Sequence, residues 1–110
     1  MAQTLNKTWI KACAVQELTP ETPKIIDAGN TRIAVFKLDG AEAGIYAIED
    51  VCTHDDGPVA EGTVEGSAIE CPRHGARFDI KTGAVLRMPA VTPIRTFPVR
   101  VIGQNVEVEV

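Results

Sequence analysis

Two short segments of the sequence combine a thiol with an imidazole at matched spacing. Cys52 and His54 form a C-x-H pattern, and Cys71 and His74 form a C-x-x-H pattern, with sixteen residues between the two segments. Both histidines of the chain and two of its three cysteines lie in these segments. Turn-forming residues follow each one, Asp-Asp-Gly-Pro after the first and Gly75 after the second. The pattern predicts two loops that close over one metal centre.

Two thiolates and two imidazoles can bind either a single zinc ion or an iron–sulfur cluster. Zinc fingers commonly place both cysteines before both histidines and carry the histidines on a helix. In this chain cysteine and histidine alternate, and the residues between the two segments are typical of strands. One ligand of each kind per loop favours a two-iron cluster, in which one iron takes both cysteines and the other both histidines. A Cys₂His₂ zinc site remains the alternative.

The elements that must position these loops are predicted to be short β-strands. The sequence is rich in Val and Ile, and its nine glycines and seven prolines favour tight turns. A strong strand covers 31–38, with Ile33 and Val35 on one face and Ala34, Phe36 and Leu38 on the other. Other strands are predicted at 8–14, 24–28, 44–48, 61–65, 68–71, 77–80, 84–86, 94–102 and 106–110, and residues 15–23 are predicted as a loop or one helical turn. The prediction is an all-β fold, an antiparallel sandwich or barrel.

The length of 110 residues predicts one domain, residues 1–110. The segment from about residue 51 to residue 89 has its own turns and holds both ligand loops. We expect it to form a small cluster-binding subdomain inserted in a larger β base. Pro98 lies inside the predicted strand 94–102 and has no amide hydrogen for a ladder, so this strand should be at an edge or bulged.

Composition narrows the class of partner and the compartment. The net charge is -4 and no basic patch is present, which argues against a nucleic-acid partner and suits a basic face on a partner protein. The first ten residues lack the apolar run of a signal peptide, and no stretch reaches the ~18 apolar residues that span a bilayer. We expect a soluble, cytoplasmic protein. An odd number of cysteines argues against a disulfide framework, and Cys13 is predicted to be a small buried apolar residue.

The two ligand segments resemble the cluster motif of Rieske proteins, in which C-x-H is followed by C-x-x-H. The run from Cys71 to Asp79, with Gly83 after it, resembles the second Rieske loop and its hairpin. The layout of nearly the whole chain resembles small Rieske-type ferredoxins, and most of all the ferredoxin components of bacterial aromatic-ring dioxygenase systems. The resemblance implies one 2Fe–2S cluster bound by Cys52, His54, Cys71 and His74.

The chain departs from one branch of this family, the Rieske subunits of quinol-oxidising complexes. Those subunits carry a disulfide between the two loops, and the positions of its two cysteines are occupied in this chain by Gly57 and Arg73. They also carry a serine and a tyrosine that donate to cluster sulfurs, and the matching positions here are Ala76 and Phe78. A missing hydrogen bond to sulfur destabilises the reduced cluster, so we expect a potential near the low end of the Rieske range, about -150 mV.

The roles of two glycines and two prolines near the ligand segments have two interpretations each. Gly57 and Gly75 are either ordinary turn residues or positions where backbone N–H groups approach cluster sulfides and a Cβ would obstruct them. Pro89 and Pro93 are expected either to stiffen a loop over the cluster or simply to connect strands. Arg77 is expected to be an exposed ion-pair partner.

The count of histidines predicts a carrier and not an enzyme. A mononuclear non-haem iron oxygenase site needs two histidines and a carboxylate, and both histidines here are assigned to the cluster. No G-x-G-x-x-G motif indicates a dinucleotide fold. We therefore expect a monomeric one-electron carrier that takes electrons from a flavoprotein reductase and passes them to a terminal Rieske oxygenase. The alternatives are a small Rieske subunit of a nitrite reductase and an iron–sulfur or redox accessory protein.

Overall fold

The fold is taken from a computed structural model of the 110-residue chain, which describes residues 8–19, 23–38, 44–51, 57–72, 75–88 and 92–110. These residues form eleven β-strands and one 3-10 turn, η1 (Val15–Glu17). Every strand pairing among them is antiparallel. The all-β prediction is confirmed, as is the single helical turn expected within residues 15–23. None of the described segments contains a helix that is long and apolar enough to cross a membrane.

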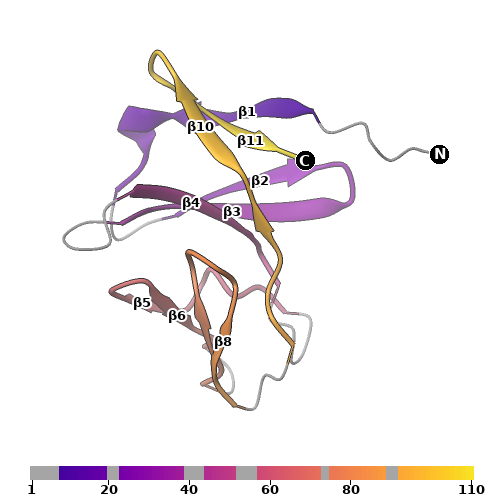
Figure 1. The fold of residues 1–110 in the computed structure, drawn as a ribbon, viewed down its shortest axis with the longest axis vertical. Helices are drawn as coiled ribbons and strands as arrows, with labels where there is room; N and C mark the ends of the chain where they lie inside the picture. Colours follow the sequence, from indigo (N-terminus) through magenta and orange to yellow (C-terminus); the bar gives the residue numbers. More distant parts are fainter. Residues whose placement is uncertain (1–7, 20–22, 39–43, 52–56, 73–74, 89–91) are drawn as a thin grey trace.

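The strands form three sheets (Figure 1). The terminal sheet has the order β1 (Trp9–Ala14), β11 (Asn105–Glu109), β10 (Val99–Ile102). The central sheet has the order β2 (Lys24–Ala28), β3 (Thr31–Leu38), β4 (Gly44–Glu49), β9 (Thr96–Phe97). The hairpin sheet has the order β5 (Thr63–Glu65), β6 (Ala68–Glu70), β7 (Arg77–Asp79), β8 (Val85–Arg87). In Figure 1 the central sheet lies between the terminal sheet above it and the hairpin sheet below it.

The central sheet is buried on both faces, and this explains why β3 is apolar almost throughout. Side chains alternate along a strand, so neighbouring residues enter different cores. Ala34, Phe36 and Ile48 pack in one core with residues of the hairpin sheet, including Ile69 and Phe78. The other core contains Ile33, Val35 and Ala47 from the central sheet, together with Val106 and Val108 from β11. The two faces predicted for residues 31–38 are confirmed.

The prediction of one continuous strand over residues 94–102 is wrong. The chain breaks at Pro98 into two short strands that belong to different sheets, β9 beside β4 and β10 beside β11. Each is the edge strand of its sheet, as the missing amide hydrogen predicts. The carbonyl of Pro98 accepts a hydrogen bond from the N–H of Glu109 at 3.0 Å, so the break itself is held to the terminal sheet.

The strand predicted at 61–65 begins two residues later, at Thr63. Residues 59–62 form a turn instead, in which the N–H of Gly62 donates to the carbonyl of Val59 at 3.0 Å. Gly62 lies directly against the end of β6, because a Cβ placed on it would be only 1.7 Å from the carbonyl oxygen of Glu70. The chain that leaves the first ligand segment therefore touches the residue that precedes Cys71.

Candidate iron–sulfur centre

The second ligand segment is closed by strand pairing. It joins β6 to β7, and the last pair before it is Glu70 with Arg77. Inside this pair the N–H of Cys71 donates to the carbonyl of Ala76 at 2.7 Å, and the N–H of Gly75 donates to the carbonyl of Cys71 at 3.1 Å. The turn is therefore a hydrogen-bonded continuation of the hairpin, and it fixes the backbone on both sides of Arg73 and His74, which lie outside the described residues.

Cys71 is the candidate ligand that the structure describes. Its side chain is buried, at 1% relative exposure. It lies in the core between the hairpin and central sheets, with Val59, Ala76 and Phe78 as members of the same core. A buried thiol at the start of a tight loop fits a soft metal ligand, because cysteine thiolates are the usual protein ligands of iron–sulfur clusters.

Gly75 is explained by its backbone conformation. Its φ of +76° is unfavourable for residues with a side chain. A Cβ there would meet only Glu70 Oε2, at 3.8 Å, so no close protein contact requires a glycine. Its N–H donates to the carbonyl of Cys71, which supports the turn interpretation. The alternative, in which backbone N–H groups approach cluster sulfides, stays a prediction.

Arg77 forms ion pairs, as the sequence predicts, but its side chain is half-buried and not exposed as expected. Its guanidinium bonds the carboxylate of Glu65, and its Nε lies 3.2 Å from Glu70 Oε1 without the alignment of a hydrogen bond. The hydrogen bond to Glu65 raises the pKa of Arg77 above its ordinary value, and the charges of Glu65 and Glu70 add to this against the opposing effect of desolvation. Arg77 thus links β5, β6 and β7 at the base of the second ligand segment.

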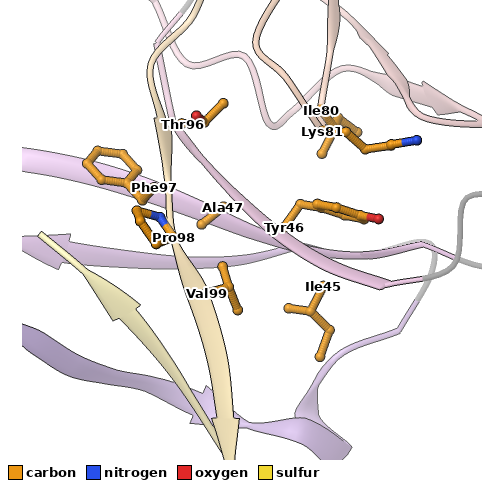
Figure 2. A pocket seen from close by; sticks show the side chains of 9 residues that line it. All are labelled: Ile45, Tyr46, Ala47, Ile80, Lys81, Thr96, Phe97, Pro98 and Val99. Carbon is orange, nitrogen blue, oxygen red and sulfur yellow. The ribbon is translucent and has the colours of Figure 1, made fainter.

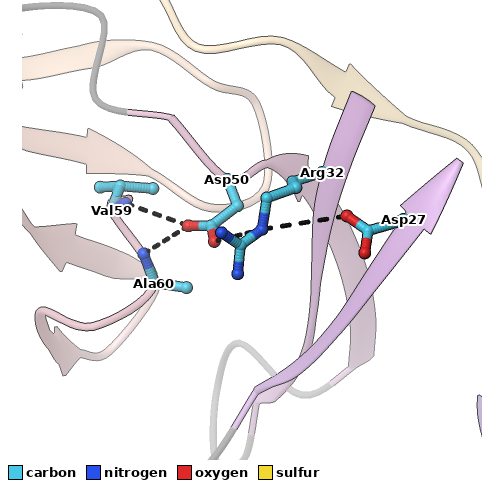
Figure 3. Close-up of polar contacts among 5 residues, drawn as sticks. All are labelled: Asp27, Arg32, Asp50, Val59 and Ala60. Carbon is cyan, nitrogen blue, oxygen red and sulfur yellow. Dashed lines mark hydrogen bonds and ion pairs between the residues drawn. The ribbon is translucent and has the colours of Figure 1, made fainter. Parts of the chain in front are cut away.

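The first ligand segment follows β4 and precedes the turn at residues 59–62. Asp50, directly after β4, is buried at 7% relative exposure. Its Oδ1 accepts hydrogen bonds from the N–H of Val59 at 3.0 Å and of Ala60 at 2.8 Å (Figure 3). The sequence interpretation did not identify this residue. The available signal was an acidic residue at the end of an apolar strand, which by itself is also typical of a solvated turn.

Three of the four candidate ligands, Cys52, His54 and His74, lie outside the described residues, as does Pro89. Pro93 is described and is exposed. The structure brings the flanks of both ligand segments together, through Gly62 against Glu70, and it places Cys71 in the core beside them. The positions Ala76 and Phe78 are fully buried, and neither offers a hydroxyl to a cluster.

A cavity of about 400 Å³ lies between β4 and the turn after β7 (Figure 2). It is lined by residues of β4, β9 and β10 and by the turn after β7, with Tyr46 and Lys81 as its polar side chains besides Thr96. Neither Cys71 nor any residue that flanks the ligand segments lines it. Of the four candidate ligands, the one that the structure describes, Cys71, therefore lies outside the described lining of this cavity.

Cys13 is a buried core residue, as predicted. It lies on β1 at 3% relative exposure, among residues of the core between the terminal and central sheets. Burial raises the pKa of its thiol, and the charge of Glu17 adds to this. Cys13 therefore stays a neutral thiol at ordinary pH, and it belongs to a different core from Cys71.

Comparison with known proteins gives the class. The Rieske [2Fe-2S] domain matches residues 8–98 of the chain. The anthranilate 1,2-dioxygenase ferredoxin subunit of Burkholderia cepacia is 36% identical over 110 residues, which cover 100% of this chain and 99% of that protein. The chain belongs to the Rieske [2Fe-2S] family, and its cofactor is one 2Fe–2S cluster.

Within this family the chain is similar to ferredoxin components. The ferredoxin of carbazole 1,9a-dioxygenase from Nocardioides aromaticivorans IC177 superposes with a TM-score of 0.82 at 33% identity, over 92% of this chain and 96% of that one. A chain in the complex of reduced oxygenase and oxidised ferredoxin of carbazole 1,9a-dioxygenase gives a TM-score of 0.83 at 36% identity, over 91% of each chain. These relatives are electron-transfer components of dioxygenase systems and not the catalytic subunits.

Proposed function

We propose that this chain is the ferredoxin component of an aromatic-ring dioxygenase system. It carries one electron at a time from a flavoprotein reductase to a terminal Rieske oxygenase. The observation that carries the proposal is the 36% identity to a dioxygenase ferredoxin subunit over the full length of both proteins. The similar chain in a complex of oxygenase and ferredoxin supports the oxygenase as one of the two partners.

We further propose that Cys52 and Cys71 hold one iron of the cluster, and that His54 and His74 hold the other. When bound, the cluster takes up and releases a single electron. The described residues support this assignment through the donor set and the burial of Cys71 at the start of a hydrogen-bonded loop. The protein's own part is to hold the ligand loops, to exclude water from the thiolate side and to set the potential.

The division of the chain is part of the same proposal. Residues 1–110 form a single domain, and residues from about 51 to 89 form its cluster-binding subdomain. The separate pairing of β5 to β8 in one sheet supports this division. We propose a cytoplasmic monomer, since a carrier that must meet two partners in turn through one exposed edge is best served by a free molecule. The relatives act in anthranilate and carbazole systems, so their names do not select one aromatic substrate for this chain.

The proposal is tested first on the purified protein. Absorption and EPR spectra, with iron and acid-labile sulfide analysis, should give a Rieske-type 2Fe–2S signal that Cys71→Ser abolishes. A colourless protein with one zinc per chain would contradict the cluster assignment. Turnover with a reconstituted reductase and terminal oxygenase then tests the route. A reduced, cluster-loaded protein that transfers no electron to any such oxygenase would favour the nitrite reductase subunit or the accessory role instead.

A further inference from the structure

The two ligand segments are closed in different ways. The second lies inside a hairpin, and the pairing of Glu70 with Arg77 holds its ends together. The first follows β4, and the next strand among the described residues, β5, begins at Thr63 and belongs to the hairpin sheet and not to the sheet of β4. Some other contact must therefore join its two ends.

Asp50 makes that contact. Two hydrogen bonds between described residues reach across the segment and end on its Oδ1, one from Val59 and one from Ala60, which are nine and ten residues further along the chain. The ring that these bonds close contains Cys52 and His54. A carboxylate that accepts two backbone N–H groups is a strong, charge-assisted anchor. Asp50 does for the first segment what the strand pair does for the second.

Asp50 is itself tied to the central sheet. Its backbone N–H donates to the carbonyl of Arg32 on β3 at 2.8 Å, and its carboxylate side chain is 2% exposed. Among the described residues, Asp50 is the one charged residue that is buried. Burial of a charge is costly unless hydrogen bonds and a counter-charge offset it, and the two N–H groups provide most of that offset. The free-energy cost of burying a charge at this one position indicates that Asp50 has a specific role.

The counter-charge is weak and secondary. Arg32 Nε lies 4.0 Å from Asp50 Oδ2 and also 4.0 Å from Asp27 Oδ1 (Figure 3). The Arg32 side chain is 59% exposed, and an ion pair at this distance in water contributes little. The hydrogen bonds to residues 59 and 60, and not the ion pair, therefore carry the contact. Asp27 is useful for the test because its carboxylate meets the same arginine from β2, far from both ligand segments in the sequence.

We propose that Asp50 is the positioning residue of the first ligand loop, and that it holds Cys52 and His54 in register with the second loop through the N–H groups of Val59 and Ala60. The inference rests on the proposed ligand set. Loss of a residue that orients metal ligands typically costs 10- to 100-fold in affinity, so removal of the Asp50 acceptor should weaken retention of the cluster by roughly this factor. The base of the fold, which is joined by other contacts, should be unaffected.

The test compares three variants of the cluster-loaded protein with the wild type. Cluster loss to an iron chelator is followed by visible absorption, and unfolding of the base by the fluorescence of Trp9, which lies on β1 in the terminal sheet and is the single tryptophan of the chain. Asp50→Ala should lose its cluster roughly 10- to 100-fold faster with an unchanged Trp9 transition. Asp50→Asn keeps an oxygen acceptor but loses the charge that strengthens both hydrogen bonds, so its rate of cluster loss should lie between those of the wild type and Asp50→Ala. Asp27→Asn should change neither signal.

Each alternative result has a definite meaning. A wild-type protein without a cluster would refute the proposed function, whereas a loaded wild type with no faster loss in Asp50→Ala would refute this inference alone. Equal shifts of the Trp9 and cluster signals would make Asp50 a general stabiliser and overturn the positioning role. Asp50→Asn as defective as Asp50→Ala would assign the effect to charge alone and overturn the role of Oδ1 as acceptor of the two N–H groups. Should Asp50→Ala fail to fold, fast hydrogen exchange at the amides of Val59 and Ala60 in the loaded wild type would overturn the inference, and slow exchange would support it.

Discussion

At the scale of single residues, Gly62 sets how closely the two ligand-bearing segments approach. It has an ordinary backbone conformation, so its lack of a side chain matters for space and not for φ. A Cβ at this position would overlap the carbonyl oxygen of Glu70, at 1.7 Å, and that oxygen belongs to a β6 backbone fixed by pairing on both sides. A side chain here would have to push the first segment's return away from Cys71.

We expect Gly62→Ala to lower the free energy of unfolding by about 1–3 kcal/mol and to reduce the iron content of the purified protein, because overpacking forces backbone shifts next to the ligands. Gly66→Ala is the matched control. Gly66 has a φ of +61° with open space around a Cβ, so its change costs only the left-handed strain, about 1–2 kcal/mol. Full iron occupancy in Gly62→Ala would show that the close approach does not serve the metal centre.

A second residue-scale prediction concerns the reduction potential. The family resemblance implies that residue 76 is a position from which a hydroxyl donates to a cluster sulfur. We expect Ala76→Ser to raise the midpoint potential, by roughly 60–130 mV if the new bond is worth the 1.5–3 kcal/mol of a hydrogen bond to a charged group. A protein-film or dye-mediated redox titration measures this shift.

The stability of the same variant separates success from failure. Ala76 is fully buried, so a serine hydroxyl without a partner would lower the free energy of unfolding by about 1–3 kcal/mol. An unchanged potential together with reduced stability would mean that residue 76 does not face the cluster. The matched variant Cys13→Ser places a hydroxyl in the other core and should leave the potential unchanged.

The residues that sequence alone could identify are those whose chemistry is written in local spacing. Cys71 and its three companion candidates stood out because thiols and imidazoles recur in two short patterns. Asp50 and Gly62 did not stand out, because the need for each arises from a partner eight to ten residues away along the chain. An aspartate that accepts two N–H groups and an aspartate in a solvated turn have the same sequence signature.

At the scale of elements, local turns were predictable and changes of sheet were not. The hairpin of β2 and β3 has the predicted bounds because Gly29, with a φ of +65°, sets the turn, and β-branched or apolar residues such as Ile25, Ile26 and Ile33 recur in both strands. The segment 94–102 was predicted as one strand because its pattern is continuous. Its division between two sheets at Pro98 depends on which strands lie beside it, and this is a property of the assembled fold.

The two faces of the central sheet give a matched pair of core substitutions. Ile33 on β3 and Ile48 on β4 are both fully buried, but Ile33 packs toward the terminal sheet and Ile48 toward the hairpin sheet that contains Cys71's core. Alanine at either position should lower the free energy of unfolding by about 2–5 kcal/mol. We expect only Ile48→Ala to accelerate cluster release below the unfolding transition, measured by visible absorption against Trp9 fluorescence.

The free energy of unfolding of each variant is the control for this pair. Similar losses of global stability in the two variants remove stability itself as an explanation for any difference in cluster release. Faster release in Ile33→Ala than in Ile48→Ala would contradict the assignment of the two cores. Equal release rates would mean that the cluster is insulated from the packing beneath it.

At the scale of the whole molecule, charge governs the encounter with partners. The net charge of -4 should attract a basic docking face, and salt screens that attraction over about 10 Å at 0.1 M ionic strength. We expect the second-order rate of electron transfer to the oxygenase to fall by roughly tenfold or more between low and high salt. Stopped-flow oxidation of the reduced protein measures it, with the midpoint potential determined at each salt concentration as the control. A rate that is constant or rises with salt would contradict electrostatic steering.

The covering of the central sheet on both faces has a consequence for anyone who wishes to transplant the metal centre. A fragment cut to the proposed subdomain, about residues 51–89, would carry the hairpin sheet and all four proposed ligands but leave Ile69, Phe78 and Ile80 facing water. Those side chains are fully buried only because Ala34, Phe36 and Ile48 lie opposite them. A graft into another scaffold must therefore include a sheet with that apolar face, so that the hairpin sheet that carries the ligand loops has a surface to pack against. The smallest unit that can be transplanted therefore has two layers, the hairpin sheet and the face of the central sheet that covers it.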